Sequence, residues 1–330
     1  MKLTDKKIDA LNIELTIDIA AADYAEAEKK KLSERRRTAE FKGFRKGMVP
    51  ASLIKRVYGE QCLVEAVNES VSKGLDEYIT GNNLHILGEP LSSENQPEVS
   101  WTEGADFNFV FDLAVSPEVK VAVEKADEVP SYSVTIAAKD KAEMIESMKK
   151  YYEEKKEEKS EEDIEKEVTE RMKEQYKSEA DWRLSKDIRS FYVQKAGIEL
   201  PEAFLKRWLF VANQGKFTKE DIEKEFGAFA EDFKWQLVRG YLMKEFKLEI
   251  SEKDVQEAAE AFVSYQYAMY GLSNVPADLI KEAAVNMLQD QKQVDRLVEQ
   301  VEDQKVFAAV KEIITLKSTK ISVSKFRELK

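Results

Sequence analysis

Apolar residues in the second half of the chain recur every three or four positions, and this pattern restricts the fold more than any other feature. After Ser160 the repeat consists of Ile164, Val168, Met172 and Tyr176; after Thr218 it consists of Ile222, Phe226, Phe229, Phe233, Leu237 and Tyr241. Such spacing places side chains on one face of an α-helix, and an apolar face needs a packing partner. The pattern therefore predicts long amphipathic helices that pack against other elements.

Helix starts in this half carry a recognisable signal. A Ser or Thr followed three residues later by Asp can satisfy amides that the first helical turn leaves unpaired. Three such pairs occur: Ser160 with Asp163, Thr218 with Asp221, and Ser251 with Asp254. Around the first pair, residues 149–168 are dense in Lys and Glu, which favours either a solvated helix held by Lys–Glu pairs or an arm that projects from the packed protein.

The first part of the chain mixes strands with helices. Residues 12–18 alternate apolar and polar side chains, as in a half-buried strand, and residues 84–90 and 105–115 are also predicted strands, the latter with Phe107, Phe109 and Phe111 on one face. Helices are expected over residues 21–37 and 51–79, with a break at Gly59. This order predicts a small α+β domain over residues 1–117, an extended linker over 118–137, and an all-α domain with arm-like helices over 138–330.

Charge is concentrated in one segment of the chain. Residues 29–56 hold eleven Lys and Arg against two Glu, a net charge of +9, whereas the whole chain has −12 and the remainder therefore −21. A basic segment on an acidic protein indicates docking to an anionic partner through one surface. The alternative is an ordinary helix with a solvated basic face.

Within that segment, "FKGFRKGMVP" (Phe41–Pro50) cannot lie inside a helix or a buried strand. Its glycines cost backbone entropy there, and Pro50 lacks an amide donor. The stretch is therefore predicted to be a loop.

Several kinds of site are disfavoured by composition. One histidine, His85, makes a histidine metal centre or a Ser-His-Asp triad improbable, and Cys62 lies in an apolar series where a packed thiol is expected. We expect no metal, no cofactor and no ATP site, because the chain lacks a phosphate-binding glycine motif. With no membrane-length apolar run and no signal-peptide core at its start, the chain is expected in the cytoplasm and away from membranes.

The loop and its surroundings resemble trigger factor, the bacterial ribosome-associated chaperone family. "GFRKGMVP" is similar to the family signature G-F-R-x-G-x-x-P, the following "SLIKRVYGEQCLVEAVNE" is similar to its next helices, and "IELPEAFLKRWL" resembles a segment of its helical domain. The resemblance implies that residues 1–117 bind the ribosome. Position by position, it assigns ribosome contact to Phe44, Arg45 and Lys46, with Gly43, Gly47 and Pro50 shaping the loop.

The resemblance also implies partners and an activity. The partners would be an exit-tunnel ribosomal protein with nearby ribosomal RNA, nascent or unfolded polypeptides, and a weak homodimer off the ribosome, but neither DNA nor a membrane. The activity would be ATP-independent chaperoning, and family labels include protein transport, cell division and isomerase. The usual prolyl isomerase domain of the FK506-binding type is not recognisable between the linker and the helices, so an enzyme is not expected.

Methionine and aromatic side chains suit a chaperone surface because they adapt to varied sequences. The helical domain offers seven candidates for client binding: Met144, Met148, Tyr152, Phe262, Tyr265, Met269 and Tyr270. For each, burial in an ordinary core is the alternative. Two other functions stay open: a prolyl cis/trans isomerase, and a general nucleic-acid-binding helical protein, against which the −21 remainder argues.

Overall fold

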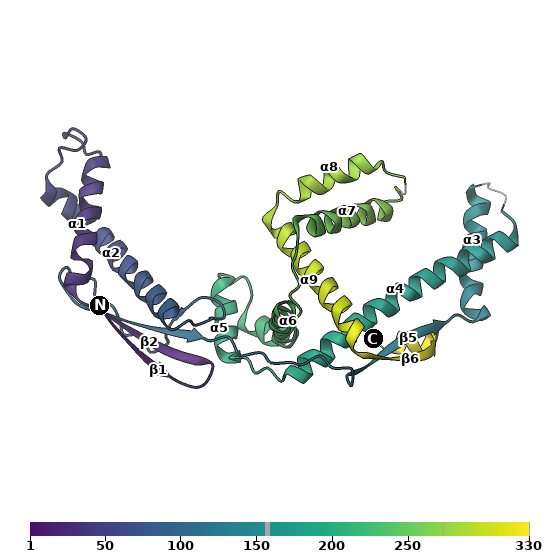
Figure 1. The fold of residues 1–330 in the computed structure, drawn as a ribbon. Helices are drawn as coiled ribbons and strands as arrows, with labels where there is room; N and C mark the ends of the chain where they lie inside the picture. Colours follow the sequence, from purple (N-terminus) through teal and green to yellow (C-terminus); the bar gives the residue numbers. More distant parts are fainter. Residues whose placement is uncertain (156–158, 273, 330) are drawn as a thin grey trace. The chain divides into compact units, whose positions relative to one another are not determined.

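The structure, a computed structural model, describes residues 1–155, 159–272 and 274–329 (Figure 1). Its contacts divide the chain into two compact units. Unit 1 comprises Met1–Glu118 and Glu199–Ala230, and unit 2 comprises Val119–Ile198 and Glu231–Lys330. Strands and helices share unit 1, and long helices dominate unit 2, so the fold is α+β as the sequence predicts.

A four-stranded antiparallel sheet forms the base of unit 1. Its strands are β1 (Lys2–Lys7), β2 (Asn12–Ile19), β3 (Leu91–Ser92) and β4 (Phe107–Ala114), in the order β1-β2-β4-β3. The predicted alternation in β2 is confirmed, because Ile13, Leu15, Ile17 and Ile19 are buried. The strand β1 was not predicted from the sequence.

Two helices of unit 1 carry the basic segment. They are α1 (Ala21–Thr38) and α2 (Ala51–Gly81), which pack against each other and cover the sheet. The expected break at Gly59 is wrong, because α2 continues through it; one helical glycine costs only about 1 kcal/mol relative to alanine. Cys62 on α2 is fully buried, and burial raises the pKa of its thiol, as fits a packed cysteine.

The predicted strand at residues 84–90 is also wrong. Only Ile86 forms an isolated bridge, to Val115, and Gly88 adopts a left-handed φ of +70° that interrupts extended structure. The indole of Trp208, on α5 (Glu202–Ala212), lies against Gly88. Beside it Arg207 pairs with Asp112 at 2.8 Å, so residues 199–230 pack in unit 1 although they follow unit 2 segments in sequence.

Unit 2 is built around α4 (Glu161–Ala196), whose predicted stripe is confirmed. Every fourth side chain is buried: Ile164, Val168, Met172, Tyr176, Ala180, Leu184, Ile188 and Tyr192. Four residues exceed one helical turn by about 40°, so this stripe winds around the helix axis. Its first half packs against α3 (Ala138–Lys155) and the short α10 (Val323–Glu328), and its last residue reaches Asp127.

The region expected to be a linker contains a strand, which is a difference from the predicted organisation. β5 (Glu128–Thr135) pairs in parallel with β6 (Thr315–Ser322) over their full lengths, from Glu128–Thr315 to Thr135–Ser322. Residues near position 130 are therefore joined to residues near position 320, and β6 interrupts a region expected to be helical.

The remaining helices are α6 (Lys219–Glu245), α7 (Glu252–Met269), α8 (Ala277–Met287) and α9 (Gln291–Ile313). The unit boundary falls within α6. Its predicted stripe holds at Ile222 and Phe226, but later the buried residues are Trp235, Val238 and Leu242. Phe233, Leu237 and Tyr241 are only half-buried, because this part of α6 is covered on an adjacent face, where Trp235 stacks on Phe307 of α9.

All three predicted helix starts are confirmed. The side-chain oxygens of Ser160, Thr218 and Ser251 accept hydrogen bonds from the amides of Asp163, Asp221 and Asp254 at 3.1–3.3 Å. The charged stretch at 149–168 forms the end of α3 and the start of α4; its residues 156–158 lie outside the described part of the chain.

Candidate functional site

The loop between α1 and α2 is shaped by two left-handed glycines. Gly43 has φ +91° and Gly47 has φ +82°, and no atom outside the adjacent residues lies within 4 Å of a Cβ built on either. Backbone conformation, not space, therefore requires glycine at both positions. The turns close through hydrogen bonds from the amide of Phe44 to the carbonyl of Phe41 (3.0 Å) and from the amide of Met48 to the carbonyl of Arg45 (2.9 Å).

The base of the loop is fixed to both helices. Val49 is fully buried, and its carbonyl accepts a hydrogen bond from Nε of Arg36 at 2.8 Å. The ring of Phe41 meets Tyr58 edge-on, with 6.2 Å between ring centroids. Pro50 is the N-cap residue of α2 and accepts a hydrogen bond from the amide of Leu53. These contacts anchor both ends of the loop to α1 and α2.

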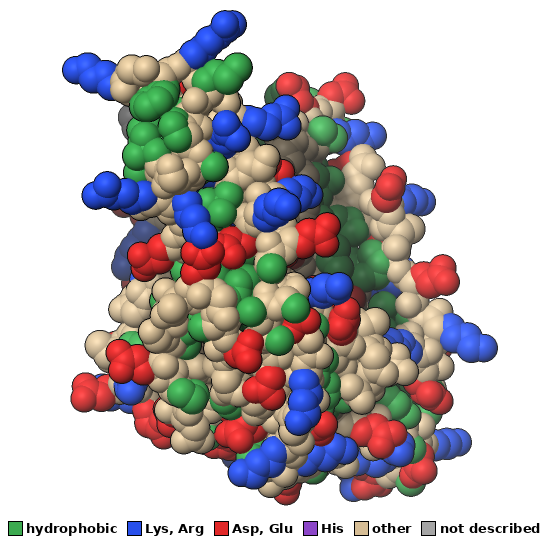
Figure 2. Space-filling view, turned by 90° about the vertical axis from the view of Figure 1, so that its left-hand side faces the viewer, with side chains coloured by type: hydrophobic (Ala, Val, Ile, Leu, Met, Phe, Trp, Pro, Cys, Tyr) green, Lys and Arg blue, Asp and Glu red, His purple; other side chains and the backbone are tan. Residues whose placement is uncertain are grey.

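The tip itself is exposed. Phe44 is 44% exposed and Met48 68%, and Arg45 and Lys46 are exposed beside them. Lys46 lies 3.5 Å from Glu40, but both side chains are open to water, so this pair contributes at most about 1 kcal/mol and can separate for a partner. In Figure 2, green hydrophobic and blue basic side chains gather at the upper left of the view.

Not every cation of the basic segment is available to a partner. Lys31 pairs with Glu69 at 3.0 Å, and this hydrogen bond raises the pKa of Lys31. Arg35 pairs with Glu65 at 2.9 Å. Such pairs join α1 to α2, whereas the loop directs its cations outward. Some cations of the basic segment therefore form ion pairs between α1 and α2, and others are exposed on the surface of the loop.

Four of the seven predicted client-binding residues form an exposed apolar surface at the end of α7. Tyr265, Met269 and Tyr270 are 64–82% exposed, and Phe262 is 37% exposed. The opposite face of α7 packs through Ala259 and Val263 against α8 and α9. We call Phe262, Tyr265, Met269 and Tyr270 the α7 tip. Leu272, Leu279 and Val285 nearby in sequence are also exposed; no pattern singled them out.

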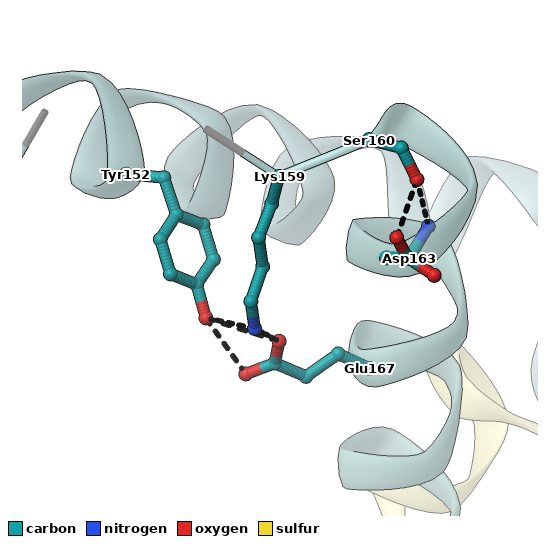
Figure 3. Close-up of polar contacts among 5 residues, drawn as sticks. All are labelled: Tyr152, Lys159, Ser160, Asp163 and Glu167. Atoms are coloured by element: carbon teal, nitrogen blue, oxygen red, sulfur yellow. Dashed lines mark hydrogen bonds and ion pairs between the residues drawn. The ribbon is translucent and has the colours of Figure 1, made fainter. Parts of the chain in front are cut away.

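The three candidates on α3 are placed differently. Met144 and Met148 are half-buried against the α4 core, and Tyr152 is buried. Figure 3 shows why Tyr152 is held: its hydroxyl donates to the Glu167 carboxylate at 3.0 Å and accepts from Nζ of Lys159 at 2.8 Å. Lys159 also bonds Glu167 at 2.6 Å, which lowers the pKa of Glu167 and raises that of Lys159. In this conformation Tyr152 is core, not client surface.

Neither a metal centre nor a membrane span is indicated in the described part of the chain. No group of three or more His, Cys, Asp or Glu side chains there could hold a metal ion. Among the same residues, no helix is both long and apolar enough to cross a bilayer.

Comparison with known families assigns both parts of the chain to one family. Residues 1–148 match the family model "Bacterial trigger factor protein (TF)", and residues 180–330 match "Probable trigger factor, C-terminal domain". The chain belongs to the trigger factor family. The signature loop lies within the first match and the α7 tip within the second.

Curated relatives agree with this assignment. The chain is 28% identical over 153 residues to the trigger factor of Francisella tularensis subsp. novicida (strain U112), a match covering 46% of this chain and 34% of that protein. It is 31% identical over 140 residues to the trigger factor of Marinomonas sp. (strain MWYL1), covering 42% and 31%. These matches span about a third of the relatives' length.

The solved structure is of a trigger factor, from a study described as "Promiscuous Substrate Recognition in Folding and Assembly Activities of the Trigger Factor Chaperone". It aligns with a TM-score of 0.56 at 12% identity, over 94% of this chain and 99% of that chain. At this identity the comparison supports the fold alone. In the present chain, residues 136–160 separate β5 from α4, and 138–155 of them form α3, so no stretch of domain length lies there.

Proposed function

We propose that this chain is an ATP-independent chaperone that docks on the ribosome through the Gly43–Pro50 loop and shields unfolded polypeptides in the cytoplasm. The observation that carries the proposal is the exposed set of Phe44, Arg45 and Lys46 on a loop with a fixed base. Arginine binds carboxylates and phosphates in bidentate geometry, and an exposed phenyl ring gains from burial by a partner. A ribosomal protein with adjacent RNA offers both kinds of contact.

In this proposal, each predicted domain has its own role. Residues 1–117 would dock on the ribosome, residues 118–137 would connect, and residues 138–330 would bind clients, with the exception that residues 199–230 pack in unit 1. A weak homodimer off the ribosome remains a prediction. The absence of domain-length sequence between β5 and α4 argues against the isomerase alternative.

Replacing Phe44, Arg45 and Lys46 together by alanine is expected to weaken ribosome binding at least about 100-fold, or about 2.7 kcal/mol. The variant loses apolar area and two cations, while the buried Val49 and its bond to Arg36 remain. Co-sedimentation with purified ribosomes over a concentration series measures the change.

A matched control removes one exposed apolar residue and two exposed cations elsewhere in unit 1: Ile8, Lys6 and Lys7, each changed to alanine. This control should bind ribosomes like the wild type. Equal binding by the loop variant and the wild type would refute ribosome docking through this loop.

The α7 tip is proposed to contact clients. Changing Tyr265, Met269 and Tyr270 to alanine should raise by at least about threefold the chaperone concentration that half-suppresses aggregation of denatured rhodanese, because an exposed apolar patch is lost. Alanine preserves helix propensity, so α7 should stay folded.

The control changes three exposed apolar residues outside unit 2 to alanine: Ile8, Val211 and Phe217, which are 51–56% exposed. It should leave suppression unchanged. If both variants lose suppression to the same extent, exposed apolar area in general, and not the α7 tip, acts on clients.

A further inference from the structure

The outer edge of β6 is exposed and pairs with no further strand among the described residues. The β5–β6 sheet has only two strands, and seven of the eight residues of β6 are exposed, all except Ile321. In Figure 1 the pair runs side by side near the carboxyl end of the chain. An isolated pair of strands leaves one row of backbone groups on each outer edge.

The ladder fixes which groups of β6 face outward. The amide of Thr315 donates to the carbonyl of Asp127 at 2.9 Å, so Thr315 faces β5. In a parallel ladder alternate residues direct both N–H and C=O to the same neighbour. Leu316, Ser318 and Lys320 therefore direct theirs away from β5, to a side where the described residues place no further strand.

The outer edge of β5 is less suited to pairing. The same alternation turns Pro130 outward, because Val129 and Ser131 face β6. Proline has no amide hydrogen, so it interrupts the row of donors on that edge. Helix α4 also packs against β5. The edge of β6, by contrast, contains no proline over eight residues, a length of about 26 Å.

We propose that the β6 edge binds an extended segment of an unfolded polypeptide as a third strand. The inference rests on the proposed chaperone function and adds a mode of recognition, in which main-chain hydrogen bonds hold the client whatever its sequence. Unfolded chains have unpaired backbone groups to offer, whereas folded proteins have few. The α7 tip would select apolar side chains, and the β6 edge would select extended backbone.

A second copy of this chain is a poorer occupant. β6 carries Lys317 and Lys320 and no acidic residue, so pairing two β6 edges would bring like charges together. Lys317 is neutralised by Glu128 of the same sheet, but no ion pair neutralises Lys320 among the described residues. The positive charge of the β6 edge therefore opposes pairing with a second β6 more than it opposes pairing with a client segment of mixed charge.

Residue-resolved amide hydrogen exchange tests the proposal on the wild-type protein. The probe is reduced, carboxymethylated α-lactalbumin, a permanently unfolded chain, added at a concentration that saturates binding. The amides of Leu316, Ser318 and Lys320 should exchange at least about tenfold more slowly with the probe, while the inward amides of Thr315 and Lys317 change little. Unchanged exchange at the three outward amides, with the probe bound, would overturn the proposal.

A pair of variants provides the second readout. Ser318→Pro removes the central outward donor without touching the β5 ladder, and Ser318→Ala keeps it. Ser318→Pro should lose the client-induced protection and Ser318→Ala should retain it. Slow exchange of the same amides in concentrated wild type without the probe would assign the edge to a second copy instead. Failure of the wild type to bind the probe at all would count against the chaperone function itself, so the two failures are distinguishable.

Discussion

Replacing Asp127 by alanine is expected to lower the free energy of unfolding of unit 2 by about 3–5 kcal/mol. The Asp127 carboxylate is buried and accepts three hydrogen bonds: from the Tyr192 hydroxyl (2.8 Å), from Nζ of Lys195 (2.6 Å) and from the amide of Glu124 (2.9 Å). Tyr192 is fully buried, so alanine would leave its hydroxyl without an acceptor. Urea unfolding followed by circular dichroism, with hydrogen exchange to locate the loss in unit 2, measures the effect.

Two controls separate the parts of this effect. Asp127→Asn keeps an acceptor for Tyr192 but loses the charge facing Lys195, so it should cost less than alanine. Glu128→Ala removes an exposed carboxylate next along the chain, paired with Lys317 in solvent, and should cost under about 1 kcal/mol. A loss below about 1 kcal/mol for Asp127→Ala would contradict the role given to this carboxylate.

The same carboxylate predicts how stability depends on pH. Burial alone would raise the pKa of Asp127, but its hydrogen bonds with Lys195, the Glu124 amide and Tyr192 outweigh burial and hold the pKa below 3.8. A lowered folded-state pKa stabilises the fold above the unfolded-state value, and this stability is lost as the pH falls through the folded-state value. The stability difference between wild type and Asp127→Asn should therefore be constant from pH 7 to about pH 5 and shrink below about pH 4.

Asp127 also shows where sequence reasoning stops. The helical stripe of α4 was predictable because its signal is local: every fourth residue from Ile164 to Tyr176 is apolar. The helix caps were predictable for the same reason. What Tyr192 contacts, however, depends on a residue 65 positions away. A carboxylate in a stretch with the appearance of a linker carries no local sign of burial.

The β5–β6 pair was missed for a related reason. β6 reads TLKSTKIS, in which polar residues dominate both faces, so it lacks the alternation that marks a half-buried strand. Its partner β5 precedes it by more than 180 residues. The local sequence of β6 indicates at most that this segment is extended. Its pairing with β5 depends on tertiary packing, in which Val134 and Ile321 contact the core formed by α4 and α10.

The two candidate functional surfaces, the Gly43–Pro50 loop and the α7 tip, also differ in how far the sequence predicts them. The signature loop could be located from sequence, because left-handed glycines, a proline and a family pattern act over eight residues. The α7 tip was among the candidates chosen from sequence, but only the structure separates it from the buried candidates, because exposure is a tertiary property. The sequence alone does not distinguish Tyr152 from Tyr265 as a client-binding candidate. In the structure Tyr152 is buried and bonded to Glu167 and Lys159, whereas Tyr265 is exposed to solvent.

Gly88→Ala is expected to lower the free energy of unfolding of unit 1 by about 2–5 kcal/mol. Two costs combine: a non-glycine residue at φ +70° costs about 1–2 kcal/mol, and overpacking costs about 1–3 kcal/mol. A Cβ at this position would lie 2.8–2.9 Å from three atoms of the Trp208 indole, a rigid ring that cannot rotate aside as a flexible chain end could. Urea unfolding with exchange monitored in α5 measures the loss.

A double variant separates the two costs. Trp208→Ala removes the ring, so adding Gly88→Ala to it should cost only the backbone part, about 1–2 kcal/mol. If Gly88→Ala costs the same with and without Trp208, the indole does not lie against the glycine. Packing of α5 in unit 1 would then depend on Arg207, which pairs with Asp112 and donates to the carbonyl of Ser92 at 3.1 Å. In that case Arg207→Ala, and not Gly88→Ala, would raise the exchange rates of α5.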